Sequence, residues 1–171
     1  MWSSEARRAR LPAVLLLAIV LPAVLGGCGF RFRGAPELPA AMAVTHIAAA
    51  DRYSVFYREL VAVLRRSDVR LTDDPAEART VIRILTDDTG RRLLSVTARN
   101  VPAEYEVYYR VRFAVDVDGV EAVPVEQLAL TRDLAFDETR VLGKAGEEDV
   151  IREAIARDLV GLVTRRLSAV H

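Results

Sequence analysis

The stretch 104–118 (EYEVYYRVRFAVDVD) places the tightest limit on what this chain can fold into. Every second residue from Tyr105 to Val117 is apolar or aromatic, and most of the residues between them are charged. Successive side chains of a strand point to opposite faces, so a period of two is the pattern of a half-buried strand. Because the alternation continues without a break, the sequence predicts one long strand with a single buried face.

Two further strands are expected beside the long one. Asp118 and Gly119 form a type I′ hairpin signal, which predicts antiparallel pairing with a strand at 125–136. Arg132 interrupts the apolar face of that strand, so we expect either a bulge or a functional position there. Residues 80–99 form either two strands flanking a turn or one long strand with a bulge, and a glycine at position 90 suits both.

The remaining periodicity predicts one short strand at 44–49 and two amphipathic helices at 53–66 and 147–167. Asp51 is the expected N-cap of the first helix. The second helix has acidic residues at its start and arginines at its end, as the helix dipole favours. The order β-α-β-β-β-α therefore predicts an α+β two-layer sandwich, with two helices packed on one face of a mainly antiparallel four-stranded sheet.

The N-terminus has the pattern of an exported lipoprotein. Three arginines precede an apolar run at 11–25, and the sequence LGGC follows and ends at Cys28, the only cysteine of the chain. The run is shorter than the about 20 residues of a spanning helix and is typical of a signal peptide. The alternatives are a plain secretory signal and a transmembrane anchor. We expect cleavage before Cys28 and acyl chains, such as palmitate, on its sulfur and new amino group.

This interpretation divides the chain into a removed signal peptide (1–27), a lipidated tether (28–40) and a single α/β domain (41–171). The remaining 144 residues hold 21 basic and 23 acidic side chains, which disfavours a nucleic-acid binder. With two histidines and no second cysteine, a transition-metal site is not expected. The sequence also lacks a Ser/His/Asp or Cys/His arrangement and a phosphate-binding loop, so we expect neither an enzyme nor a cofactor beyond the acyl chains.

Several short motifs in a fixed order resemble the LPS-assembly lipoprotein LptE family over nearly the whole chain. They are Cys28-Gly29-Phe30, Arg33-Gly34, Leu94-Ser95-Val96, Ala103-Glu104-Tyr105, Arg132, Phe136-Asp137, Val141-Leu142-Gly143-Lys144 and Glu147-Glu148. The resemblance implies a lipoprotein anchored on the periplasmic side of the outer membrane. Such a protein would plug and help assemble the LptD β-barrel, and bind lipopolysaccharide (LPS) during its delivery to the outer leaflet.

LPS presents phosphates and sugar acids, which Arg and Lys side chains bind. Lys144, the only lysine, is expected in a loop between the last strand and the last helix, at a position that the family links to LPS contact. Arg99 or a neighbour corresponds to a second such position, at a hairpin tip. Further candidates for LPS contact are Arg91, Arg92, Arg110 and Arg112. Tyr108, on the outward face of the long strand, is the expected aromatic contact with a protein partner.

Two other functions are compatible with a lipid-anchored domain of this size. The first is a periplasmic lipoprotein that binds a small ligand on its own, which would require an enclosed apolar pocket. The second is a lipid-anchored hydrolase, which would require titratable groups clustered in a cleft.

Overall fold

The computed structural model describes residues 37–135 and 141–170. Cys28, the expected signal peptide and most of the expected tether lie outside these residues. The described residues form five strands, two α-helices and two short 3-10 helices. In chain order they are η1 (Ala40–Ala43), β1 (Val44–Ala49), α2 (Val55–Arg66), β2 (Arg70–Leu71), η2 (Pro75–Glu77), β3 (Thr80–Val96), β4 (Pro102–Val117), β5 (Val120–Ala135) and α3 (Val141–Leu167).

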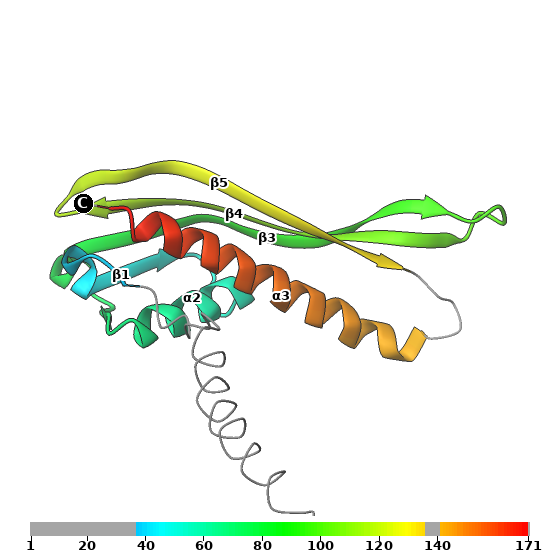
Figure 1. Cartoon of the computed structure of the whole chain (residues 1–171), viewed down its shortest axis with the longest axis horizontal. Coiled ribbons are helices and arrows are strands. Elements are labelled where there is room, and N and C mark those ends of the chain that lie inside the picture. The colour runs from blue at the N-terminus through cyan, green and yellow to red at the C-terminus, as the bar shows by residue number, and fades with distance from the viewer. Residues whose placement is uncertain (1–36, 136–140, 171) are drawn as a thin grey trace, which may run out of the picture. The chain divides into compact units, whose positions relative to one another are not determined.

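The strands form one mixed sheet in the order β2-β1-β3-β4-β5 (Figure 1). The long strands β3, β4 and β5 pair antiparallel, whereas β1 is parallel to both β2 and β3. The prediction of a mainly antiparallel four-stranded sheet was therefore wrong. The helix α2 joins β1 to β2, and a helical crossover returns the chain so that the second strand runs parallel to the first. With two residues, β2 is too short to show any alternation in the sequence.

The central hairpins follow the predicted pattern. Asp118 and Gly119 have positive φ values of 51° and 81°, which a type I′ turn requires, and they connect β4 directly to β5. Within the segment 80–99, residues 80–96 form one long strand, β3, whose register shifts near Thr86 and again near Ser95. Arg132 lies in regular register with Val107, so no bulge occurs there, and its guanidinium pairs with Asp158 of α3 at 2.6 Å.

Helix α2 begins later than expected. Ser54 is its N-cap, because the Ser54 side chain accepts a hydrogen bond from the Tyr57 amide at 3.0 Å. Asp51, the predicted cap, instead accepts a hydrogen bond from the Tyr53 amide in the preceding turn. The buried face of α2 is the predicted one, since Phe56, Leu60 and Leu64 are fully buried.

Both helices cover one face of the sheet (Figure 1), and the hydrophobic core lies between the two layers. Strand β4 contributes most from the sheet, and α3 contributes a stripe from the helical layer. The fully buried side chains of these two elements include Val107, Val111, Phe113, Val115, Ile155, Leu159, Val163 and Leu167. Burying a side chain of this size contributes about 2 kcal/mol, so this layer contact accounts for much of the stability of the fold.

A buried hydrogen-bond network joins α2 to the sheet. The Tyr109 hydroxyl donates to the Asp87 carboxylate at 2.7 Å and accepts from the Phe56 amide at 3.2 Å. Asp87 also bonds to the Ser54 hydroxyl. Burial and, next, the neighbouring Asp87 carboxylate raise the pKa of Tyr109 well above its ordinary value. The sequence gives Tyr109 as a core residue but contains no local signal for the pairing of residues so far apart.

Candidate functional site

Strands β3 and β4 continue beyond the end of β5. The β5 strand ends where Ala135 pairs with Glu104, whereas the β3–β4 pairing extends to Val96 and Pro102. A turn follows, in which the Thr97 amide bonds to the Val101 carbonyl at 2.7 Å. We call residues 91–105 the distal hairpin. Its end, residues 96–103, therefore projects past the last residue pair of β5 (Figure 1).

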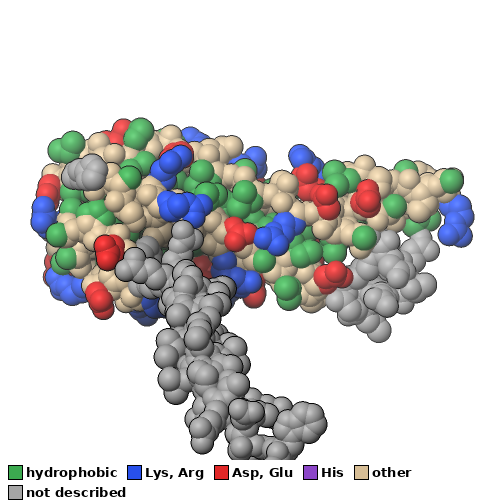
Figure 2. All heavy atoms as spheres, in the orientation of Figure 1, with side chains coloured by type: hydrophobic (Ala, Val, Ile, Leu, Met, Phe, Trp, Pro, Cys, Tyr) green, Lys and Arg blue, Asp and Glu red, His purple; other side chains and the backbone are tan. Residues whose placement is uncertain are grey.

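The distal hairpin exposes apolar and basic side chains together. Leu93, Leu94 and Val96 are 49%, 46% and 48% exposed, although all three belong to a strand. Arg99 in the turn is also exposed and forms no ion pair within the described part of the chain. Figure 2 shows hydrophobic and basic side chains side by side at the end of this hairpin. A clustered apolar surface that the fold leaves uncovered is typical of a binding site.

The two neighbouring arginines of the hairpin point to opposite faces of the sheet. On the helix face, Arg91 pairs with Glu148 of α3 at 2.9 Å and lies 5.0 Å from the centroid of the Tyr105 ring. On the outer face, Arg92 pairs with Glu106 at 2.6 Å. Both arginines remain at least half exposed, so each is positioned by its partner and still open to an anion.

Lys144 lies in the first turn of α3, because this helix begins at Val141. The expectation that Lys144 lies in a loop was therefore wrong, and its side chain lies outside what the structure describes. Glu148 follows one helical turn later, which is about 6 Å along the axis, and contacts Arg91 of the distal hairpin. The fold thus brings the first turns of α3 close to the hairpin, two segments that are far apart in the sequence.

The other three candidates lie further along β4, on the outer face of the sheet. Arg110 pairs with Asp88 at 2.5 Å and lies 5.9 Å from the centroid of the Tyr108 ring. Arg112 is exposed and has no acidic partner among the residues described. Arg91 and Arg110 thus lie on opposite faces, and the six predicted basic residues do not form a single patch.

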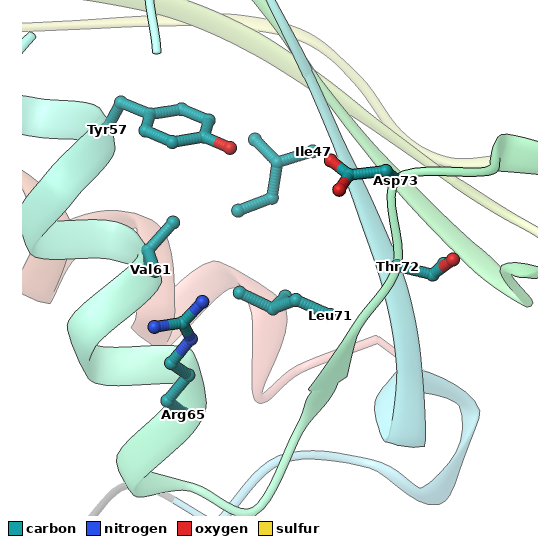
Figure 3. Close-up of a pocket in the computed structure, with 7 residues that line it drawn as sticks. All are labelled: Ile47, Tyr57, Val61, Arg65, Leu71, Thr72 and Asp73. Atoms are coloured by element: carbon teal, nitrogen blue, oxygen red, sulfur yellow. The ribbon is translucent and has the colours of Figure 1, made fainter. Parts of the chain in front are cut away.

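A small cavity lies between α2 and the β1–β2 edge of the sheet (Figure 3). Its volume is about 160 Å³, below the several hundred Å³ of typical ligand pockets. It is lined by apolar side chains together with two charged ones, Arg65 and Asp73, and Asp73 already pairs with Arg52 at 2.7 Å. This cavity does not fit the enclosed apolar pocket that a solitary small-ligand binder requires.

The structure shows no group of three or more metal-ligating side chains in residues 37–135 and 141–170. His46 is buried in β1, where its Nδ1 bonds to the Thr72 carbonyl oxygen at 2.9 Å, a structural role. No described helix is both long and apolar enough to cross a bilayer.

The fold of this chain is similar to the folds of two solved bacterial lipoproteins. The uncharacterized lipoprotein B of Nitrosomonas europaea is 24% identical, with a TM-score of 0.69 over 82% of this chain and 91% of that one. The rare lipoprotein B of Shewanella oneidensis is 25% identical, with a TM-score of 0.63 over 71% of this chain and 91% of that one.

The model of the family described as "LptE: Lipopolysaccharide-assembly" matches residues 42–167, and the chain belongs to this family. Among curated relatives, the LPS-assembly lipoprotein LptE of Yersinia enterocolitica is 27% identical, covering 96% of this chain and 78% of the relative. The LPS-assembly lipoprotein LptE of Pectobacterium atrosepticum is 26% identical, covering 92% of this chain and 84% of the relative. The family comprises non-enzymatic lipoproteins of LPS assembly that need no cofactor, so the predicted family and the absence of catalysis are confirmed.

Proposed function

We propose that this protein is an outer-membrane lipoprotein that plugs and helps assemble the LptD β-barrel, and that it binds LPS during delivery to the outer leaflet. The observation that carries the LPS part is the distal hairpin, which exposes arginines next to uncovered Leu and Val side chains. LPS combines phosphates and sugar acids with acyl chains. A surface with guanidinium groups and apolar side chains matches both parts of such a ligand.

The proposed anchor begins with cleavage after residue 27 and acylation of Cys28. The tether 28–40 has 13 residues, which span at most about 45 Å when fully extended. Gly29 follows the acylated cysteine, which agrees with sorting to the outer membrane in this class of lipoprotein. The domain 41–171 would then lie on the periplasmic side of the outer membrane, within reach of a barrel.

Charge reversal in the proposed LPS site tests the binding role. We expect the double variant Arg99→Glu/Lys144→Glu to bind LPS about tenfold more weakly, because two charge-assisted contacts become repulsive. Arg58→Glu is the matched control, since Arg58 is exposed on α2 and has no ion pair within the described residues. If the double variant binds LPS as tightly as the wild type and the control do, Arg99 and Lys144 are not part of the LPS-binding site.

Depletion of the protein in cells separates the two parts of the proposal. We expect both mature barrel and surface LPS to fall. Normal barrel maturation with reduced surface LPS would limit the role to lipid delivery, and the reverse would limit it to barrel assembly. If neither quantity changes, the proposed function is wrong.

A further inference from the structure

Strand β5 forms one edge of the sheet, and most of this edge is regular (Figure 1). Residues 126–135 pair one to one with residues 104–113 of β4. Apart from this pairing, residues 126–134 make no backbone hydrogen bond within the described part of the chain. Alternate N–H and C=O groups of a strand point to opposite sides, so those of β5 that point away from β4 are open to a further strand.

The devices that protect natural sheet edges are confined to the start of β5. Proline and bulges are two such devices, and Pro124 and both register shifts of the β4–β5 pairing precede residue 126. The outward-facing residues that follow, Gln127, Ala129 and Thr131, are exposed and uncharged. This part of the edge therefore carries nothing on its outer face that repels another strand.

The helix-facing side chains of this edge are arranged symmetrically. They follow the order Glu126, Leu128, Leu130 and Arg132, and the outward-facing Ala129 lies at the centre. In an antiparallel pair of two such strands with Ala129 opposite Ala129, each Glu126 would lie opposite Arg132 of the other copy. Each Leu128 would then lie opposite Leu130. Sliding one strand by two residues in either direction would instead place Glu126 opposite a leucine, so the charges select one register.

Helix α3 adds to the charge order of the edge. Arg166 of α3 pairs with Glu126 at 3.0 Å, and Asp158 of α3 pairs with Arg132 at 2.6 Å. All four side chains remain at least partly exposed. In the register given above, the Arg166–Glu126 pair of one copy would meet the Arg132–Asp158 pair of the other, so that positive and negative groups alternate across the interface.

We propose that residues 126–132 of β5 pair with the same residues of a second copy of this chain, which gives a two-fold symmetric dimer with one continuous sheet. A strand of another protein would have to supply the complementary charge order itself, whereas a second copy supplies it by symmetry, because a two-fold interface makes each contact twice. The inference concerns the free protein. It goes beyond the proposed function and does not depend on it, since neither LPS nor a barrel takes part in the pairing.

Cysteine cross-linking of the chain purified from cells in mild detergent tests the register. Ala129→Cys should form a disulfide-linked dimer under mild oxidation, because directly opposite Cβ atoms lie about 5 Å apart. Thr131→Cys is the matched control on the same face. Its two copies would lie four residues apart along the strands, about 13 Å, which is too far for a disulfide. The wild type, whose only cysteine is Cys28, gives the background.

Charge reversal tests the pairing across the interface. Arg132→Glu and Glu126→Arg would each place like charges opposite each other twice, so we expect the dissociation constant of either dimer to rise about tenfold in sedimentation velocity. A mixture of the two variants should dimerise like the wild type, because every charge then meets an opposite one. Each variant loses one partly exposed ion pair within its own chain, which contributes little to stability. Arg58→Glu, on α2, is the control and should dimerise normally.

Three results would overturn the inference. They are a wild type that stays monomeric at every concentration, a Thr131→Cys dimer as abundant as that of Ala129→Cys, and a mixture that dimerises no better than its separate variants. If Ala129→Cys cross-links to a barrel protein and not to itself, the edge binds that partner and the inference is again overturned. None of these results decides the proposed function, which LPS binding and depletion test separately.

Discussion

Replacing Tyr109 by Phe tests the network that fixes α2 to the sheet. The substitution keeps the ring in the core, where Tyr109 is 1% exposed, and removes only the hydroxyl. The Asp87 carboxylate then loses a donor at 2.7 Å, and the Phe56 amide at the start of α2 loses its acceptor at 3.2 Å. A hydrogen bond to a charged group contributes about 2 kcal/mol, so the free energy of unfolding should fall by about that amount.

For a domain of this length the loss corresponds to a melting temperature lower by about 6 °C, measurable by circular dichroism. Tyr108→Phe is the matched control. Its hydroxyl makes no hydrogen bond to any residue that the structure describes, so we expect a change below about 0.5 kcal/mol. Equal losses in the two variants, or none in Tyr109→Phe, would refute the importance of the network.

The same network predicts a pH dependence. The folded state holds the pKa of Tyr109 above the value of 10.0 expected for the unfolded chain. This contribution to stability is fully present below pH 10 and is lost as the pH rises toward the folded pKa, because only the unfolded state then releases the proton. Wild-type protein should therefore lose stability above pH 10 more steeply than Tyr109→Phe. Parallel curves would contradict the assignment.

Two predictions concern the β4–β5 turn. Gly119→Ala should destabilise the fold by about 1 kcal/mol, because φ is 81° at this position. Gly146→Ala inside α3 is the comparison and should stabilise the fold by up to about 1 kcal/mol. Chemical denaturation measures both changes, and changes of the same sign would contradict the turn assignment. Arg79 lowers the pKa of Asp118, so this pair stabilises the fold above the unfolded pKa and loses that effect as the pH falls below it. Asp118→Asn should flatten the acid side of the stability curve, and an unchanged curve would show that the pair contributes nothing.

The long elements could be predicted because their patterns repeat many times. Strand β4 alternates throughout, the Asp118–Gly119 turn fixes its partner, and α2 keeps one apolar face. Where the pattern has too few repeats, the prediction failed. The edge strand β2 has two residues, and its position follows only from the α2 crossover. The early start of α3 at Val141 was missed because two glycines in its first turns resemble a loop.

The candidate site, like the fold, could be predicted from the sequence only in part. The resemblance to the family identifies Arg99, and Arg91 and Arg92 are candidates because of their basic side chains. The alternation of β4 places Tyr108 and Arg110 on the outer face. Their partners depend on register, which no local pattern reveals. The contact of Arg91 with α3 and the position of the Tyr108 ring over Gly90 join segments that meet only in the folded chain.

Purification of the affinity-tagged protein from outer membranes in mild detergent tests the central claim most directly. The account predicts that it elutes with an LptD barrel in equal amounts, and that the complex carries LPS. A stable monomer that elutes without barrel or LPS would contradict the proposed role.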